Sequence, residues 1–291
     1  MTAVLDNLGI DWAGKSRQAC PSCAKSSCTA LHVSILADGA VAYCHRCHSS
    51  WFERERESVG PMATLHDIRQ RREHEIRRAA EAGRLEREQQ SDAAKDARAI
   101  WDAARPVTSH VYLSRKKIAA HGVRIDAEGR LVVPMYVGNE IVNVQRIFAD
   151  GAKRFLRGGR TRGAYYVLRD CSLDIGAVFV AEGFATGATV HEAMGLPVVV
   201  AFSASNLLAV AATARRLFPG DAIVVAADND ANGTNRNVGL EAAERAAREI
   251  GGLLVAPDMA GDWNDLYIAK GWAEVVSQLN RAADHAIRSR S

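Results

Sequence analysis

Five acidic residues in the second half of the sequence follow apolar runs that are typical of buried strands. Asp228 and Asp230 stand one residue apart directly after the run AIVVA, and Glu182 ends a similar run. Asp262 and Asp265 come shortly after a further run, in the segment GDWNDL. Carboxylates that face one another repel, and burial raises their pKa values, unless cations lie among them. The pattern predicts a Mg2+ site, in which two ions could stabilise the attacking and leaving oxygens of a phosphoryl transfer.

A purely structural interpretation can explain each acidic segment singly. Glu182 could cap a helix, and Asp228 and Asp230 could be turn residues before Asn232-Gly233. It does not explain why all the segments follow apolar runs, so the metal site is the favoured interpretation.

A second candidate metal site consists of two cysteine pairs near the N-terminus. His32, His45 and His48 could replace a thiolate but are interpreted as surface residues, and Cys28 and Cys171 stand outside the pattern. A disulfide framework belongs to secreted chains, and the N-terminus carries no secretion signal. Two C-x2-C pairs separated by twenty residues are typical of one structural Zn2+, here with the ligands Cys20, Cys23, Cys44 and Cys47.

The elements that would position these residues follow from the hydrophobic pattern. Residues 30–44 predict two short strands joined by a turn at Asp38-Gly39, the layout of a zinc ribbon that needs its metal to fold. Farther along, Val-rich runs alternate with helical segments, which predicts a doubly wound, mostly parallel sheet. The functional crevice of such a sheet lies beyond the carboxyl ends of its strands. We expect AIVVA to be a central strand, with Asp228 and Asp230 on one side of its end and Asn229 turned away.

Between the two candidate sites the sequence changes character twice. Residues 56–106 are rich in Glu and Arg, which predicts a charged, solvated helical linker with Gly83 as a weak point. Residues 107–175 predict strands followed by a basic segment interleaved with Gly and aromatic residues, which suits phosphates and unstacked bases, although a solvated hairpin would look the same. The candidate nucleotide- and template-binding residues are Arg146, Lys153, Arg154, Arg157 and Arg160.

Length and composition limit the class of protein. The chain has 291 residues, 48% of them hydrophobic, and a net charge of only +3, so any positive field must be local. No apolar run reaches the length of a membrane span, and we expect a cytoplasmic protein with no membrane partner. The predicted order is a zinc ribbon, a charged helical linker, a basic α+β subdomain and a doubly wound α/β domain with a C-terminal helix, at residues 1–55, 56–106, 107–175 and 176–291.

Three of these motifs resemble the Toprim domain, which bacterial-type primases share with topoisomerases, some nucleases and recombination mediators. They are VAEGFATGATV, VVAADNDANGTN and GDWNDLY. The segment RLVVPMYVGNEIVNVQRIFADGAKRFLRGG is similar to the basic subdomain that precedes this domain in phage and plasmid primases, and the zinc ribbon extends the resemblance over nearly the whole chain. One departure is Thr186, where some relatives carry a further acid.

The resemblance implies template-directed synthesis of short RNA primers from NTPs on single-stranded DNA in a bacterial host cell, with two catalytic Mg2+ or Mn2+ ions. Asp228 and Asp230 would hold the ions with the nucleotide phosphates. Asp262 would complete the site, with Asp265 as the second choice. Glu182 would be an acid/base or metal-positioning group near the attacking 3′-hydroxyl.

The remaining parts have implied roles as well. The basic residues would neutralise phosphates, and the ribbon would read exposed bases at the start site. A replicative helicase is expected in trans, because the sequence holds no G-x-x-x-x-G-K-[ST] loop. Two other classes stay open: a DNA-binding recombination scaffold with zinc and Toprim elements, and a Toprim metal-dependent nuclease.

Overall fold

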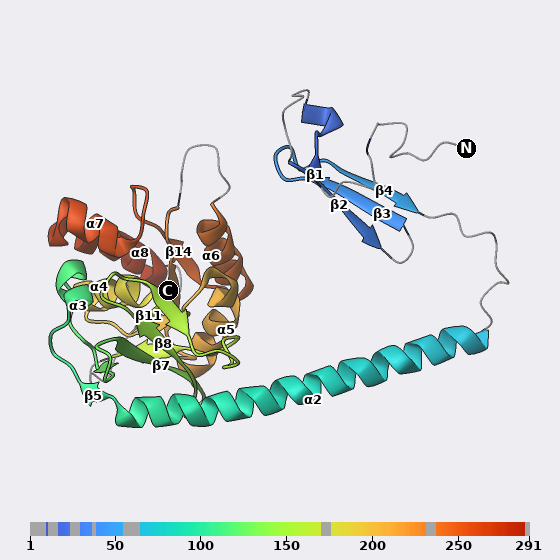
Figure 1. Ribbon diagram of the computed structural model, residues 1–291. Coiled ribbons are helices and arrows are strands. Elements are labelled where there is room, and N and C mark those ends of the chain that lie inside the picture. The colour runs from blue at the N-terminus through green and yellow to red at the C-terminus, as the bar shows by residue number, and fades with distance from the viewer. Residues whose placement is uncertain are drawn as a thin grey trace. The chain divides into compact units, whose positions relative to one another are not determined.

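The structure of the protein is a computed structural model (Figure 1). It describes residues 10, 17–23, 30–36, 39–54, 65–169, 176–230 and 237–288. Five residues named in the sequence predictions lie outside these ranges: Cys28, Asp38, Cys171, Asn232 and Gly233. The chain divides into two compact units, Met1–Ile76 and Arg77–Ser291. No helix within the described ranges has both the length and the apolar character needed to cross a membrane.

The N-terminal unit is built on a four-stranded antiparallel sheet in the order β1-β2-β3-β4. Its elements are β1 (Arg17–Gln18), the short 3-10 helix η1 (Pro21–Cys23), β2 (Leu31–Leu36), β3 (Gly39–Cys44) and β4 (Ser50–Arg54). The two strands predicted within residues 30–44 are confirmed as β2 and β3. A few small side chains, among them Leu31, Val33 and Ala42, form the core with the buried cysteines. So small a core is typical of a domain that depends on a metal ion for its stability.

The 39-residue helix α2 (Leu65–Ala103) follows, and it continues through Gly83 without a break. From residue 69 to residue 92 its residues are exposed, apart from the half-buried Gly83 and Gln90. Ion pairs at helical spacing run along it, such as Arg84 with Glu88 at 2.9 Å. This stretch agrees with the predicted charged, solvated helix.

One face of the last turns of α2 is buried, so the prediction of a solvated linker is wrong for this face. Ala97 and Ala104 are buried against Val132 and Val144 of the neighbouring sheet. Small side chains on one face, Ala93 included, let the helix approach the strands closely.

The first part of the C-terminal unit is a five-stranded antiparallel sheet in the order β5-β6-β7-β8-β9. Its elements are β5 (Arg105–Pro106), α3 (Val111–Lys116), β6 (Arg124–Ile125), β7 (Leu131–Val137), β8 (Glu140–Ile147) and β9 (Lys153–Phe155). Side chains alternate across β7 and β8. Val132 and Val144 face α2, whereas Leu131, Val133 and Ile147 join the core shared with the second sheet.

The second sheet has the order β10-β12-β11-β13-β14, with β10 antiparallel and the others parallel. Its strands are β10 (Tyr166–Leu168), β11 (Ala177–Ala181), β12 (Val198–Val200), β13 (Ala222–Ala226) and β14 (Leu253–Val255). The other elements are α4 (Phe184–Met194), η2 (Ala204–Asn206), α5 (Leu207–Leu217), α6 (Val238–Glu249), α7 (Trp263–Lys270) and α8 (Trp272–Arg288). The predicted doubly wound, mostly parallel fold is confirmed, and β13 is an interior strand next to the central β11.

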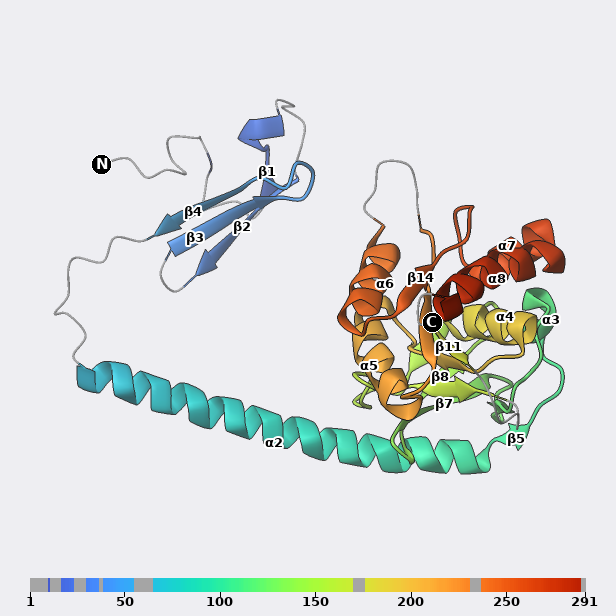
Figure 2. The ribbon, with the colours of Figure 1, turned by 180° about the vertical axis from the view of Figure 1, so that it is seen from behind.

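Helices cover both faces of this sheet, as Figure 2 shows, with α5 and α6 on one side and α4, α7 and α8 on the other. The register places Ala181 opposite both Val200 and Ala226, and Ala226 opposite Val255. The parallel strands therefore end level with one another. Residues that follow them meet at one edge.

The strand β10 comes from the segment predicted as the basic subdomain, yet it pairs with β12 of the second sheet, Tyr166 opposite Val200. Residues 77–291 share one compact unit. The finer boundaries drawn at 56, 107 and 176 stay predictions.

Candidate metal-dependent active site

Four carboxylates lie together at the carboxyl edge of the parallel strands. Glu182 follows β11 directly, Asp228 and Asp230 follow β13, and Asp262 precedes α7. Burial first, and then the charges of Asp262, Glu182 and Asp230, raise the pKa of Asp228 to about 8. The pKa of Glu182 is also raised, first by burial and then by Asp230, while the backbone N–H of Ala204 opposes the shift. The structure thus brings four of the five predicted acids into one electrostatic cluster.

The surroundings of the Asp228 carboxylate suit a metal ligand. Its Oδ1 atom is buried and has no hydrogen-bond partner among the described residues. A buried carboxylate oxygen without a partner is costly, and a hard divalent cation is the species that such oxygens bind. The residues present therefore fit Mg2+ or a similar ion.

A glycine in the first turn of α6 makes room for two of the acids. A Cβ atom on Gly239 would lie 3.1 Å from Oδ2 of Asp230 and 3.9 Å from Oε2 of Glu182. The same helix begins here, and its N-terminal N–H groups favour negative charge. Gly239 was not among the sequence predictions, because a single glycine near a helix start carries no distinctive signal.

Asn229 anchors the acidic strand end to the loop that carries Asp262. Its backbone exchanges two hydrogen bonds with Gly261, at 2.9 and 2.7 Å. Its side chain donates to the carbonyl oxygens of Pro257 and Met259, both at 3.1 Å. Asn229 thus points away from the acids it separates and fixes the two acidic segments relative to each other.

The two aspartates of GDWNDL have different surroundings. Asp262 caps α7 by accepting a hydrogen bond from the backbone N–H of Asp265, and its charge acts on Asp228. Asp265 uses one carboxylate oxygen to accept from the backbone N–H of Asp262 and the other to pair with Lys116 at 3.3 Å. Between them, the fully buried Asn264 donates to the Lys116 carbonyl oxygen at 2.7 Å. Asp262 therefore belongs to the acidic cluster, and Asp265 holds its neighbour in place.

Of the five basic candidates, Lys153 is the one that the structure brings to the acids. Its Nζ atom lies 3.6 Å from where a Cβ on Gly183 would stand, and its charge lowers the pKa values of Glu182 and Asp228. Lys153 pairs with the buried Ile147 on β8, so its side chain lies on the sheet face that meets the second sheet.

The other basic candidates lie elsewhere. Arg146 and Arg154 are paired across β8 and β9 on the opposite sheet face, where Arg146 is 3.8 Å from Asp126 and Arg154 stacks over Phe148. The exposed Arg157 follows β9. Arg160 donates to the carbonyl oxygen of Arg162. Because successive side chains of β9 point to opposite faces of the sheet, Lys153 and Arg154 lie on different faces although they are adjacent basic residues in the sequence.

The four predicted cysteine ligands form a second candidate metal site, in the N-terminal unit. Their sulfur atoms all lie within 4.8 Å of one another, and Cys20–Cys47 and Cys23–Cys44 are each 3.6 Å apart. Tetrahedral Zn–S bonds of about 2.3 Å place sulfurs about 3.8 Å apart, so the cluster fits such an ion. Hydrogen bonds with the side chain and backbone of Ser49 lower the pKa of Cys47 to about 6, which favours the thiolate that binds metal. The cluster is confirmed, and no histidine belongs to it in the described ranges.

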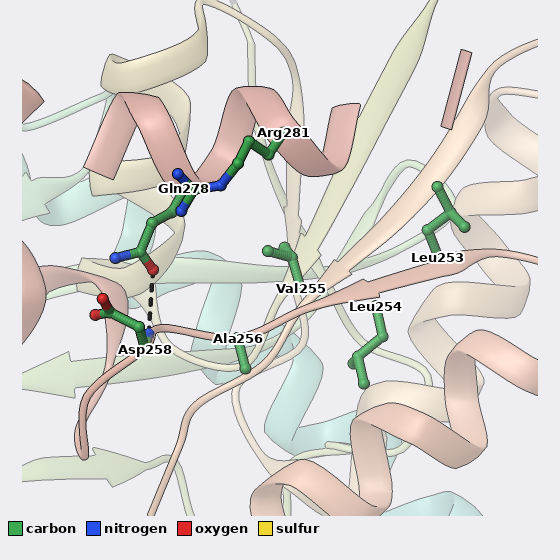
Figure 3. Close-up of a pocket in the computed structure, with 7 residues that line it drawn as sticks. All are labelled: Leu253, Leu254, Val255, Ala256, Asp258, Gln278 and Arg281. Carbon is green, nitrogen blue, oxygen red and sulfur yellow. Dashed lines mark hydrogen bonds between the residues drawn. The ribbon is translucent and has the colours of Figure 1, made fainter. Parts of the chain in front are cut away.

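A separate cavity of about 360 Å³ lies beside β14 and α8 (Figure 3). Its described lining includes Leu253, Val255 and Arg281, and Gln278 accepts a hydrogen bond there from the backbone of Asp258. None of the four clustered carboxylates lines it.

The raised pKa of Asp228 predicts a pH-dependent stability of the magnesium-free protein. Because folding raises this pKa from 3.8 to about 8, the folded state binds the proton more tightly than the unfolded state. Stability should therefore fall as the pH rises from about 5 to 8. Thermal unfolding after dialysis against magnesium-free buffer measures this fall, and Asp228→Asn should flatten it. Equal slopes for the two proteins would contradict the prediction.

Residues 177–273, which hold the four clustered carboxylates, match the family model described as the Toprim domain. The resemblance seen in the sequence is thereby confirmed for this segment. The chain is also similar to the DNA primase TraC of Escherichia coli, with 34% identity over 191 residues that cover 62% of this chain and 18% of that protein. A second DNA primase TraC of Escherichia coli is 34% identical over 157 residues, covering 51% of this chain and 11% of that protein. The chain thus spans less than a fifth of the length of these curated relatives.

Solved primase structures are similar at lower identity. The primase fragment of the bacteriophage T7 primase-helicase protein is 15% identical, with 90% of this chain and 98% of that chain covered and a TM-score of 0.45. The RNA polymerase domain of Mycobacterium tuberculosis primase DnaG is 16% identical, with 68% and 82% covered and a TM-score of 0.40.

Proposed function

We propose that the chain is a DNA primase that synthesises short RNA primers on single-stranded DNA by divalent-metal-dependent nucleotidyl transfer. The observation that carries this proposal is the cluster of four carboxylates with Lys153 at the carboxyl edge of the Toprim sheet. The similarity to the DNA primases TraC supports the choice of primase over other Toprim functions.

The residues of the cluster have distinct roles in this proposal. Asp228, Asp230 and Asp262 would hold two Mg2+ or Mn2+ ions together with the nucleotide phosphates. The bound ions would stabilise charge on the attacking and leaving oxygens. Glu182 has a raised pKa and would accept the proton of the attacking 3′-hydroxyl. Lys153 would neutralise charge on the transferred phosphate.

Three further elements complete the proposal. The four cysteines would hold one structural Zn2+, and the ribbon would contact exposed template bases. Arg146, Arg154, Arg157 and Arg160 would contact template phosphates away from the acids. A helicase acting in trans would supply unwound DNA.

Incubation with single-stranded DNA, labelled NTPs and Mg2+ tests the proposal. Short RNA products whose formation requires Mg2+ would support a primase. Shortened DNA would instead indicate a nuclease, and DNA binding without any product would indicate a scaffold. Either of these results would overturn the proposal.

The ion pair between Lys116 and Asp265 leads to a prediction about metal affinity. Lys116→Met should raise the Mg2+ concentration needed for half-maximal primer synthesis by about tenfold, because groups that orient a metal ligand typically change metal affinity by that much. The rate at saturating Mg2+ should change little. Direct Mn2+ titration without nucleotide gives a second readout of the same change.

The adjacent Lys117 provides the matched control. Its Nζ atom lies 5.9 Å from the centre of the Tyr267 ring rather than against a carboxylate. Lys117→Met should therefore leave Mn2+ affinity unchanged. If Lys116→Met and Lys117→Met gave the same affinity, Lys116 would have no positioning role.

A further inference from the structure

An aromatic pair, Phe155 and Phe202, lies beside the acidic cluster. Phe155 on β9 is 38% exposed, and its ring meets the ring of Phe202 edge to face, with centroids 6.4 Å apart. Phe202 follows the end of β12, and its backbone N–H donates to the carbonyl oxygen of Glu182 at 2.7 Å. The pair is thus tied directly to one of the four acids.

Phe202 adopts a backbone conformation that a bulky residue rarely adopts. Its φ angle is +69°, in the left-handed region. Two hydrogen bonds fix the preceding residue: the backbone N–H of Ala201 donates to the Ala181 carbonyl oxygen at 2.8 Å, and the Asn206 side chain donates to the Ala201 carbonyl oxygen at 2.8 Å. Strained residues held by their surroundings are concentrated at functional sites. The strain here places an aromatic ring, 8% exposed, under Phe155.

Phe155 and Lys153 share one side of β9, because they are two residues apart on a strand. Two residues along a strand span about 6.6 Å. Lys153 reaches the acids, and Phe155 presents its ring one step farther along the same face. A cation for phosphate and an aromatic face at this separation match the two ends of a nucleotide, its phosphate and its base.

We propose that Phe155, supported by Phe202, is a stacking site for a nucleobase next to the acidic cluster. This inference rests on the proposed function and extends it by naming where a base is held. The base belongs either to the nucleoside triphosphate at the metal site or to the template strand. Stacking on an aromatic ring accepts every base, because each base has a π-face.

Equilibrium binding to the full chain in the presence of Mg2+ tests the site. The probes are ATP, ribose 5-triphosphate, a short deoxyadenylate oligonucleotide and an abasic oligonucleotide of the same length. Phe155→Ala should weaken binding of ATP or of the deoxyadenylate strand at least about fivefold, since stacking of one base on an aromatic ring commonly has this effect or more. Binding of ribose 5-triphosphate and of the abasic strand should not change. The probe that responds identifies the source of the base.

Control variants distinguish stacking on an aromatic ring from contact with any large apolar side chain. Phe155→Trp should retain the affinity, whereas Phe155→Leu should behave like Phe155→Ala. Leu217 is 46% exposed at the end of α5, and Leu217→Ala should change no affinity. Equal affinities of the unaltered protein and Phe155→Ala for both base-bearing probes would overturn the stacking site, as would a failure of the unaltered protein to bind either probe.

Primer synthesis by the same preparations keeps the two proposals apart. If the protein makes no primers but its binding of a base still depends on Phe155, the stacking site is supported and the proposed primase function is overturned. If the protein makes primers and Phe155→Ala changes neither base binding nor the rate of synthesis, the primase function is supported and the stacking site is overturned.

Discussion

Asp228→Asn should reduce primer synthesis by about a hundredfold to a thousandfold, because removal of a group that stabilises transition-state charge commonly costs this much. Asp228 has the raised pKa, the buried oxygen without a partner and the three acidic neighbours. An amide at this position has one oxygen fewer and no charge, so the cluster would lose the ligand on which it is centred. Incorporation of labelled NTPs on single-stranded DNA measures the loss.

Asp221 is the matched control for this variant, because it lies at the opposite end of the same strand, directly before β13. Asp221→Asn should keep primer synthesis close to that of the unaltered protein. Without divalent ions, Asp228→Asn should also melt at a higher temperature at neutral pH, since an amide folds without the proton uptake that the raised pKa of Asp228 imposes on the carboxylate. If Asp228→Asn were fully active, or as active as Asp221→Asn, the proposed role of Asp228 would be contradicted.

Cys44→Ser should unfold the N-terminal unit while the C-terminal unit stays folded. Cys44 is fully buried in the small ribbon core, and structural zinc sites contribute on the order of 10 kcal/mol to such domains. Zinc analysis should show loss of about one equivalent, and limited proteolysis should remove residues 17–54 and spare the Toprim sheet. The second expectation follows from the division of the chain into two compact units.

His45→Ala is the control for Cys44→Ser. His45 lies next to the cluster, with its ring 5.1 Å from that of Tyr43, but it belongs to none of the sulfur contacts. The zinc content should therefore remain at one equivalent. A metal-free but protease-resistant Cys44→Ser protein would show that the ribbon does not need its ion.

The amino-acid sequence indicates where four of the five candidate acids lie, but it does not indicate that Asp265 lies apart from them or which groups hold them. Asp228 and Asp230 could be predicted because an uninterrupted apolar run fixes where a buried strand ends. Lys153 could not be separated from Arg154, since their sides of the sheet depend on how β9 pairs with β8. Lys116 contacts a residue 149 positions away and has no local signal.

One face at the end of α2 is buried, and the sequence carries a pattern that indicates this contact. Ala93, Ala97 and Ala104 recur at helical spacing within a charged sequence, and small residues at such intervals indicate a close helix contact. The average charge of the segment concealed this stripe. Asn264 is the converse case, because a buried amide between two aspartates has no sequence feature that separates it from an ordinary cap residue.

The pairing of β10 with β12 limits where the chain can be divided into fragments or fused to other proteins. A fragment beginning at residue 176 would keep every clustered acid yet leave the fully buried Val198–Val200 as an open sheet edge, which invites aggregation. Lys153 would be lost with the same cut. Because β9 pairs with β8, and β7 and β8 share the core of the second sheet, the two sheets form one transferable module. A fusion or exchange with another protein would therefore have to join the chain upstream of β5.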